Sequence, residues 1–374
     1  MGEGGAQRVL LSLINEYLDL GIEITVISLA KNDLHTLPKI VNKIYLRNKN
    51  ESCRLYETLL IPYYAWKLKK YIELKKFTTI QSHLFRANFV NLLSKIFYAK
   101  HIVQLVNHSV ISRFLKEGFS GKVNLFLIKR FYAKADKIFY ISKRMQKDFL
   151  IHVEGIEQKS KMIYNPYDMT KIIEESKEIS EHFIFNPSTT YLITVGRLIS
   201  LKRFEDVLLT LSKLDSSIEL IMLGDGIKKV ELLRLAKKLN ITSRVHFLGQ
   251  VQNPFFYIAR SDLFISSSSV EGFPNVLVEA MICRTAIIST DCVSGPREIL
   301  APTTDYTYQL QEGKEIAEFG ILYGIGDTKA LKESIELLLA DRTLRVNYED
   351  KAFEQSKQFS IKKISKLYQE AYFQ

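Results

Sequence analysis

Cysteine, proline and tryptophan are scarce in this sequence, which has three, eight and one of them among 374 residues. Cys53, Cys283 and Cys292 form no C-x-x-C pair, so neither a disulfide framework nor a structural zinc site is expected. No apolar stretch of about 18 residues is free of charge, which excludes a membrane-spanning helix. The opening residues MGEGGAQR lack the basic and apolar regions of a secretory leader. These absences predict a cytoplasmic protein.

Motifs of several common enzyme classes are also missing. The sequence has no G-x-x-x-x-G-K-[ST], no G-x-S-x-G and no H-E-x-x-H, which argues against a P-loop nucleotidase, an α/β-hydrolase and a zinc protease. No two aspartates are separated by one residue, so the D-x-D metal-binding pair is absent as well. We therefore expect neither a bound metal nor another cofactor.

Charge is unevenly distributed along the chain. Residues 1–165 hold 27 Lys and Arg against 13 Asp and Glu, a net charge of +14, whereas residues 166–374 hold 25 against 28, a net charge of −3. A strongly basic half predicts an anionic partner, either nucleic acid or a membrane surface. The alternative is that the surplus lysines only solvate helix faces.

Short β-branched runs alternate with longer helical patterns throughout. This alternation predicts parallel sheets with helices on both faces, and the length requires two such α/β domains. We expect an N-terminal domain at 1–165, a C-terminal domain at 166–350, and a C-terminal helix at 351–374 that crosses back to the first domain. Strands are expected at Ile22–Ser28, Thr79–Ser82, Ile102–Asn107, Lys137–Ser142, Lys161–Tyr164, Tyr191–Val195, Ile218–Leu223, Val245–Leu248, Asp262–Ser266, Ala286–Thr290 and Gly320–Tyr323, and helices at Gly5–Leu20, Cys53–Lys76, Phe85–Ala99, Lys122–Ala133, Phe204–Lys213 and Lys228–Leu239.

The chain opens on the glycine turn Gly2–Gly5 and then on a helix, with no strand before the turn. In a doubly wound sheet that strand lies in the middle, and its loss would leave two neighbouring strands unpaired. We therefore expect either that Met1 is not the natural start or that the first strand was removed from this chain.

The segment Ser266–Ala280 carries the most specific pattern. A predicted strand ends there, a Glu-Gly-Phe-Pro loop follows, and Asn275 is suited to cap the helix that comes next. The start of that helix, at the carboxyl edge of a parallel sheet, predicts an anion-binding site. Glu271 and Glu279 can then accept hydrogen bonds from hydroxyl groups of one ligand. A lone solvated glutamate is the alternative, and the combined pattern argues against it.

Weaker candidates follow other predicted strands. Gly196, Arg197 and Lys202 come after Tyr191–Val195, and a guanidinium beside a mobile ammonium suits a diphosphate, although such surface pairs are common. The turn at Gly224 is by itself typical of a strand end. In the first half, His108 follows Ile102–Asn107, His83 and Arg86 follow Thr79–Ser82, and Gly4 and Gly5 are similar to a phosphate-binding turn.

Together these motifs resemble the retaining glycosyltransferases of family four, whose GT-B fold has two facing Rossmann-like domains. The resemblance covers essentially the whole chain, from GEGGAQRVL through ADKIFYISK, IYNPYD, VGRLISLKRF, LGDG, VHFLGQV and SSSSVEGFPNVLVEAM to GILYGIGD. Its most specific element is the pair Glu271 and Glu279 with GFPN. The string Ser294–Glu298 is similar to the bacterial branch that builds lipopolysaccharide, capsule or O-antigen.

The resemblance implies a role for each matching residue. Arg197 and Lys202 would bind the donor diphosphate and stabilise the leaving nucleotide, Glu271 would hold sugar hydroxyls, and Glu279 would accept from the ribose. His108 would contact the sugar near the reacting carbon. The implied donor-binding set also includes Gly196, Gly224, Val251, Gly272, Phe273, Pro274, Asn275, Val276 and Leu277, and Gly4 and Gly5 would lie against the diphosphate or the acceptor.

The implied reaction moves a hexose or N-acetylhexosamine, with retained configuration and without a metal, to a hydroxyl of a lipid-linked or polysaccharide acceptor. Uridine diphosphate is the expected leaving group, with guanosine diphosphate second. A nucleotide-sugar epimerase of the same fold is the alternative. A nucleic-acid-binding module would explain the basic half but not the paired glutamates, so no nucleic acid is expected.

The segment Arg54–Phe77 combines aromatic and aliphatic residues with five lysines and the only tryptophan. Such a segment predicts an interfacial helix that holds the protein on the inner face of the cell membrane through anionic lipid. The alternative is an amphipathic helix packed on the N-terminal sheet. Pro62 interrupts the segment, so one continuous helix is not expected.

Overall fold

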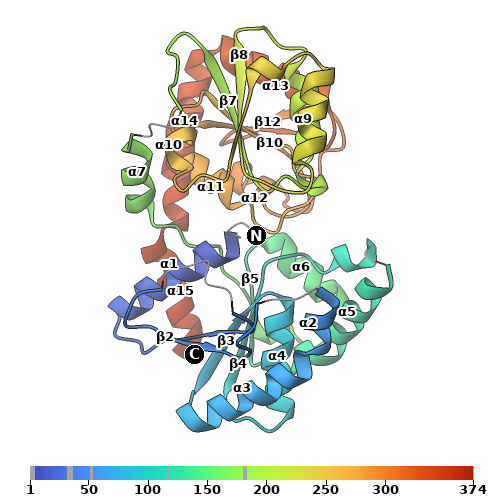
Figure 1. The fold of residues 1–374 in the computed structure, drawn as a ribbon, viewed down its shortest axis with the longest axis vertical. Coiled ribbons are helices and arrows are strands. Elements are labelled where there is room, and N and C mark those ends of the chain that lie inside the picture. Colours follow the sequence, from blue (N-terminus) through green and yellow to red (C-terminus); the bar gives the residue numbers. More distant parts are fainter. Residues whose placement is uncertain (1–4, 32–36, 51–53, 117, 180–182, 374) are drawn as a thin grey trace. The chain divides into compact units, whose positions relative to one another are not determined.

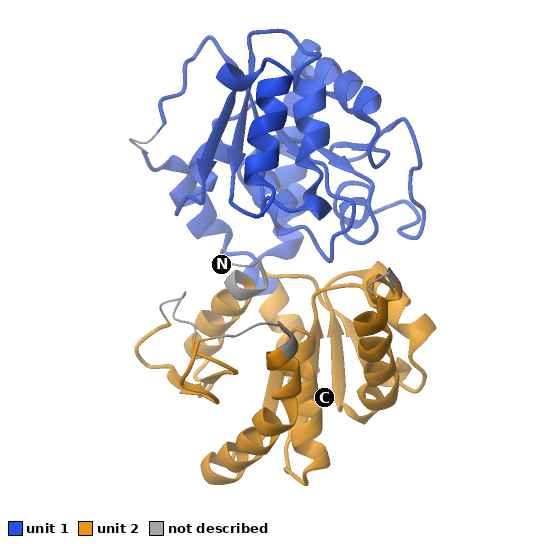
Figure 2. Cartoon of the chain, turned by 45° about the vertical axis from the view of Figure 1, so that its right-hand side comes forward, with its two compact units in different colours: residues 1–2, 167–363 blue, residues 3–166, 364–374 orange. Residues whose placement is uncertain are grey.

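The computed structural model describes residues 5–31, 37–50, 54–116, 118–179 and 183–373 (Figure 1). The chain divides into two compact units (Figure 2), which are described separately below. The C-terminal unit spans residues 167–363, and the N-terminal unit comprises residues 3–166 together with 364–374. Among the described residues, none of the helices has both the length and the apolar character needed to cross a membrane.

The C-terminal unit is built on one seven-stranded sheet with the order β12-β13-β11-β10-β7-β8-β9. All neighbours pair in parallel except β12, which is antiparallel to β13. The five inner strands are almost continuously buried, as expected for a sheet covered on both faces, whereas the edge strands β9 and β12 are mostly half-buried. Their bounds are β7 (Thr190–Val195), β8 (Ile218–Leu223), β9 (Val245–Gly249), β10 (Leu263–Ser266), β11 (Ala286–Thr290), β12 (Lys314–Ile316) and β13 (Ile321–Tyr323).

Helices cover both faces of this sheet (Figure 1). One layer contains α8 (Phe204–Leu211), α9 (Lys229–Lys238) and α13 (Thr328–Ala340), whose apolar residues form the main core with the sheet. The other contains α10 (Phe255–Ile258), α11 (Asn275–Ile282) and α14 (Arg342–Ser356), with α7 (Met169–Lys177) packed on α10 and α11. Shorter helices are α12 (Pro296–Leu300), η4 (Ser200–Lys202), η5 (Thr242–Arg244) and η6 (Lys357–Phe359).

The described residues of the N-terminal unit form two separate parallel sheets. One has the order β3-β4-β5-β6, and the other pairs β1 with β2. The strands are β1 (Thr25–Ser28), β2 (Asn42–Tyr45), β3 (Thr79–His83), β4 (Ile102–Asn107), β5 (Lys137–Tyr140) and β6 (Ser160–Met162). The helices are α1 (Gly5–Asp19), α2 (Arg54–Leu59), α3 (Ile61–Lys75), α4 (Phe85–Ile96), α5 (Gly118–Phe131), α6 (Lys143–His152), η1 (Ser112–Lys116), η2 (Tyr132–Lys134) and η3 (Glu157–Lys159).

The last helix, α15 (Ile361–Phe373), packs mostly within the N-terminal unit. Its Tyr368 is buried, and the ring lies edge-on to Phe139 of β5 at 5.4 Å between centroids. The hydroxyl of Ser365 donates to the Glu16 carboxylate of α1 at 3.1 Å. Residues at the two ends of the chain therefore stabilise the same unit.

The expected α/β architecture is confirmed, with Ile102–Asn107, Ile218–Leu223 and Ala286–Thr290 found at the predicted bounds. Two strands, β2 and β12, were not predicted. Only two of the four residues in β2 are apolar, and β12 has three residues at the sheet edge, so neither shows a periodic pattern. The helical stretch predicted at Cys53–Lys76 is divided near Pro62, as expected: α2 ends at Leu59, and α3 begins at Ile61 with Pro62 in its first turn.

Leu84, which links β3 to α4, has a strained backbone. Its φ of 72° and ψ of 152° lie in a region that is essentially restricted to glycine, and 52% of the residue is exposed. We expect Leu84→Gly to be more stable than Leu84→Ala by about 1–2 kcal/mol, because both lose the side chain and only glycine relieves the strain. Urea unfolding of the two variants measures the difference. Equal midpoints would show that this linker is not strained in solution.

Candidate functional site

The loops that follow β7 and β10 meet at the centre of the C-terminal sheet. From β7 the chain proceeds to β8 and β9, and it then returns to β10 on the other side of β7. In doubly wound sheets, ligands bind beside the carboxyl ends of the strands at this change of direction. Lys202 follows β7 and Glu271 follows β10. The topology therefore brings two predicted site residues, 69 positions apart in the chain, to one place.

Hydrogen bonds join these two loops directly. The amide of Ser269 donates to the carbonyl oxygen of Leu201 at 2.8 Å, and the hydroxyl of Ser267 donates to the carbonyl oxygen of Lys202 at 2.7 Å. The second bond fixes the backbone of Lys202 itself. Sequence reasoning gave these serines no role, because a serine run after a strand is also typical of an ordinary loop.

The side chains of Lys202 and Glu271 form an ion pair, with Nζ donating to Oε1 at 2.5 Å. The lysine side chain is 19% exposed and the glutamate side chain 14%, so the pair is mostly shielded from water while one edge stays open. A charge-assisted hydrogen bond in such surroundings is stronger than a surface ion pair. The pair therefore places an ammonium and a carboxylate side by side at the carboxyl ends of the strands.

Arg197 is not a member of this ion pair. Its side chain is exposed in the loop directly after β7. The sequence predicted that Arg197 and Lys202 act together on a diphosphate, and this stays a prediction; in the structure Lys202 pairs with Glu271. An exposed guanidinium on the same loop is free to turn toward an anion that binds beside Lys202.

Two glycine turns allow the ends of β7 and β8 to touch. Gly224 has a φ of 129°, and a Cβ on it would lie 2.0 Å from the carbonyl oxygen of Gly196. A Cβ on Gly226 would lie 2.4 Å from the carbonyl oxygen of Leu198. The amide of Gly224 also donates to the carbonyl oxygen of Gly249 at the end of β9, at 2.6 Å. Gly224 and Gly226 thus lie too close to the backbone after β7 to carry a side chain.

The helix after the Glu271 loop begins one residue earlier than predicted. Asn275 was expected to be the N-cap of α11, but Pro274 occupies that position and Asn275 is the first helical residue. The Asn275 side chain instead accepts a hydrogen bond from the hydroxyl of Tyr167 at 2.6 Å. The prediction was wrong because this side chain has a tertiary partner, which a local capping pattern does not reveal.

Most of the remaining predicted donor-binding residues lie in the Glu271 loop and at the start of α11. The side chains of Phe273, Pro274 and Leu277 are buried in the unit, so only their backbone groups are available to a ligand. Gly272 and Val276 are half-buried, as is Val251, which lies two residues beyond β9. Glu279, in the second turn of α11, is only 4% exposed.

The loop after β11 supports the Glu271 loop from the other side. The hydroxyl of Ser294 donates to the carbonyl oxygen of Gly272 at 2.6 Å, and the amide of Glu271 donates to the carbonyl oxygen of Val293 at 3.3 Å. A Cβ on Gly295 would lie 2.3 Å from Cδ of Pro274. The Ser294–Glu298 string therefore packs against the segment that carries Glu271.

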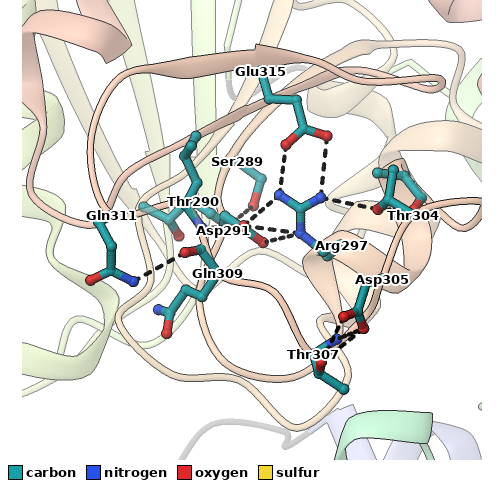
Figure 3. Close-up of polar contacts among 12 residues, drawn as sticks. Ser289, Thr290, Asp291, Arg297, Thr304, Asp305, Thr307, Gln309, Gln311 and Glu315 are labelled. Atoms are coloured by element: carbon teal, nitrogen blue, oxygen red, sulfur yellow. Dashed lines mark hydrogen bonds and ion pairs between the residues drawn. The ribbon is translucent and has the colours of Figure 1, made fainter.

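A buried arginine anchors this supporting loop (Figure 3). Arg297, which is 4% exposed, donates to the carboxylate of Asp291 at 2.7–3.2 Å and to that of Glu315 at 2.7 and 3.2 Å. Its Nη1 also donates to the hydroxyl of Thr304 at 3.0 Å. Asp291 accepts in addition from the amide of Leu310 at 2.7 Å. Arg297 thus connects β11, β12 and the intervening segment 301–313, a role that its sequence context did not indicate.

In the N-terminal unit, His108 and His83 lie at the carboxyl ends of adjacent strands. The two rings are 3.0 Å apart between Nε2 of His108 and Nδ1 of His83, and Nε2 of His83 lies 3.2 Å from Oε1 of Gln81. Burial lowers the pKa of His83 to about 3, with a smaller contribution from His108, and burial lowers the pKa of His108 to about 4. Both rings are therefore neutral at neutral pH.

The predicted phosphate turn falls partly outside the described residues. Gly4 lies outside the described residues, and Gly5 is the first residue of α1, so the predicted phosphate turn stays a prediction. In the described ranges, no cluster of three or more His, Cys, Asp or Glu is arranged to hold a metal ion.

Sequence comparison agrees with the expected family. A family model described as Glycosyltransferase Family 4 matches residues 3–171, and one described as Glycosyl transferases group 1 matches residues 175–355. An uncharacterized glycosyltransferase of Methanocaldococcus jannaschii is 31% identical over 353 residues, which cover 87% of this chain and 86% of that protein. The predicted resemblance is confirmed.

One relative and one solved structure add detail. The N-acetylgalactosamine-N,N'-diacetylbacillosaminyl-diphospho-undecaprenol 4-alpha-N-acetylgalactosaminyltransferase of Campylobacter jejuni is 29% identical over 372 residues, covering 98% of this chain and 95% of that protein. The crystal structure of Anabaena HepE in complex with UDP and glucose has a TM-score of 0.75 at 19% identity, covering 100% of this chain and 97% of that one. The second comparison shows a shared fold.

Proposed function

The chain belongs to the family 4 glycosyltransferases, and we propose that it transfers a hexose or N-acetylhexosamine from a nucleoside diphosphate sugar to a hydroxyl of a lipid-linked or polysaccharide acceptor. The proposed product is a bacterial surface glycan with retained anomeric configuration. The observation that carries this proposal is the Lys202–Glu271 pair at the switch point of the C-terminal sheet. A nucleotide sugar offers an anionic diphosphate and a hydroxylated ring next to each other, which matches an ammonium beside a carboxylate.

Each charge of the pair has a proposed task. When the bond between the anomeric carbon and the diphosphate breaks, negative charge grows on the leaving oxygen, and Lys202 stabilises it together with the exposed Arg197. Glu271 accepts hydrogen bonds from sugar hydroxyls and thereby orients the ring. Glu279, buried in α11, is proposed to accept from the ribose.

Retention is proposed to proceed without a general-base carboxylate. The acceptor oxygen forms the new bond on the face that the diphosphate leaves, and its proton passes to a leaving phosphate oxygen. Two observations support this route. Glu271 is already engaged by Lys202, and Glu279 is 4% exposed, so neither of these carboxylates is placed to take a proton from an acceptor.

The donor nucleotide and the acceptor class are inferred from the relatives. We propose UDP as the nucleotide because the Anabaena protein, which shares the fold, was solved with UDP. We propose a lipid-linked acceptor because the Campylobacter relative is named for a diphospho-undecaprenol substrate. The chain would then work at the inner face of the cell membrane.

A donor panel tests the proposed function. The purified protein is incubated with UDP- and GDP-linked hexoses and N-acetylhexosamines, with bacterial lipid extract as acceptor, and with or without EDTA. We expect a new lipid-linked glycan by mass spectrometry with a UDP sugar, and equal yield in EDTA. Isomerised free nucleotide sugar without a glycan product would favour the epimerase alternative, and loss of activity in EDTA would contradict metal-independent transfer.

The exposed side of α3 supports the proposed membrane contact. One face of the helix, including Tyr64, Leu68 and Ile72, is buried in the N-terminal unit. The other carries Tyr63 and Trp66, which are 40% and 46% exposed, and Nζ of Lys70 lies 3.7 Å above the Trp66 ring. The packed-helix alternative thus accounts for one face of α3, and the exposed face has the aromatic and basic residues of an interfacial helix.

We expect the quadruple variant Lys69→Glu, Lys70→Glu, Lys75→Glu and Lys76→Glu to bind anionic vesicles at least 10-fold more weakly than the unchanged protein. Each lysine near an anionic surface contributes about 1 kcal/mol, and reversal adds repulsion. Co-sedimentation with anionic and neutral vesicles measures the effect. The matched control reverses four exposed lysines of the C-terminal unit, Lys213, Lys237, Lys238 and Lys329. An equal loss in both variants would show that net charge alone, and not α3, determines binding.

A further inference from the structure

Gln81, His83 and His108 form a chain of side-chain contacts at the carboxyl edge of the N-terminal four-stranded sheet. Gln81 and His83 are two residues apart on β3 and therefore project to the same face of the sheet. His108 follows β4, the strand that pairs with β3. The contacts are 3.2 Å from Gln81 Oε1 to His83 Nε2 and 3.0 Å from His83 Nδ1 to His108 Nε2.

The donor and acceptor in each of these two contacts follow from the chemistry of Gln81. An amide oxygen only accepts, so His83 carries its proton on Nε2 and donates to Gln81. Nδ1 of His83 then has a lone pair and accepts from His108, which must carry its own proton on Nε2. The remaining nitrogen of His108, Nδ1, is left as an acceptor. Among the described residues it has no hydrogen-bond partner.

We infer that Gln81 and His83 are positioning residues that hold His108 in the Nε2–H form, so that Nδ1 accepts a hydrogen bond from a hydroxyl of the sugar being transferred. This inference rests on the proposed function for the role of His108, whereas the tautomer itself rests on the contacts alone. Because burial lowers the pKa of both histidines, each ring is neutral and has one donor and one acceptor. The acceptor at Gln81 therefore determines which ring nitrogen is protonated in both histidines.

Gln81→Lys is the variant that reverses the donor and acceptor roles in the hydrogen bonds between residue 81, His83 and His108. An ammonium only donates, so Nε2 of His83 becomes the acceptor, its Nδ1 donates to His108, and the His108 proton moves to Nδ1. Gln81→Met removes the polarity without reversing it and serves as the second variant if the buried ammonium prevents folding. His101→Gln is the matched control, because His101 precedes β4 at the opposite edge and its Nε2 contacts the amide oxygen of Asn91 at 2.8 Å.

Two measurements test the inference. Long-range ¹H–¹⁵N correlation spectra identify which ring nitrogen of His108 is protonated, with His108→Gln for assignment. We expect an unprotonated Nδ1 in the natural sequence and in His101→Gln, and a protonated Nδ1 in Gln81→Lys. Transfer by Gln81→Lys and Gln81→Met should fall about 10- to 100-fold, as is typical when the partner that orients a functional histidine is removed.

The outcomes separate the inference from the proposed function. A protonated Nδ1 in the natural sequence, or an unchanged His108 tautomer in Gln81→Lys, would overturn the inference. The spectra need no turnover, so they decide the tautomer even if the donor panel yields no product. UDP binding by calorimetry should be unchanged in the Gln81 variants, because Lys202 and Glu271 belong to the other unit. Full transfer by a variant with a reversed tautomer would contradict the role given to Nδ1.

Discussion

Lys202→Ala is expected to lower kcat/KM for sugar transfer about 30- to 1,000-fold. This range corresponds to about 2–4 kcal/mol, the usual contribution of one preorganised group to the stabilisation of developing charge. Glu271→Gln should have an effect of similar size, because the amide keeps the shape of the side chain and loses the charge that holds Lys202. Neither change should unfold the protein, since the pair lies at a loop edge and retains some exposure.

The double variant makes this prediction more specific. If Lys202 and Glu271 act as one unit, the loss in the double variant should be close to that of either single variant rather than to their product. Lys332→Ala is the matched control, because Lys332 forms an ion pair with Glu336 at the same 2.5 Å on the exposed surface of α13. Steady-state kinetics and thermal unfolding on all four variants supply the data. Near-native kcat/KM for Lys202→Ala, with full loss confined to Glu271→Gln, would assign the chemistry to the carboxylate alone.

The sequence predicted the strands and the strand ends well because both depend on local patterns. Buried parallel strands are short apolar runs, and Lys202 and Glu271 each follow such a run. Their proximity at the sheet edge depends on the strand order, in which β10 lies beside β7, and no local pattern contains that order. The contact between their side chains did not follow, because it depends on hydrogen bonds from Ser267 and Ser269 that no spacing rule contains.

The errors have a common physical cause. Asn275 has a good capping side chain, yet Tyr167, more than 100 residues away, takes its oxygen. In the sequence, Arg297 was noted only as part of Ser294–Glu298, which is similar to one bacterial branch of the family. In the structure, its ion pairs with Asp291 and Glu315 identify it as a structural anchor. In each case a distant residue decided the role, and a single sequence without aligned relatives does not reveal distant pairs.

Arg297→Met is expected to lower the free energy of unfolding of the C-terminal unit by about 3–5 kcal/mol. The change removes one member of a buried ion cluster and leaves the Asp291 carboxylate, whose side chain is 1% exposed, without its main partner. The effect should extend to the proposed donor site, because the loop that Arg297 anchors also bonds to the backbone of Gly272. We therefore expect weaker UDP binding in addition to lower stability.

Two probes localise the loss. The only tryptophan, Trp66, belongs to the N-terminal unit, so urea unfolding followed by its fluorescence should change less than unfolding followed by circular dichroism. Arg297→Met combined with Asp291→Asn should recover part of the stability, because the amide oxygen can still accept from Leu310 and no unpaired charge remains buried. A loss below 1 kcal/mol in Arg297→Met would mean that water reaches Asp291 and Glu315 once the guanidinium is gone. An equal shift in both probes would mean that this cluster determines the stability of the whole chain and not of one unit.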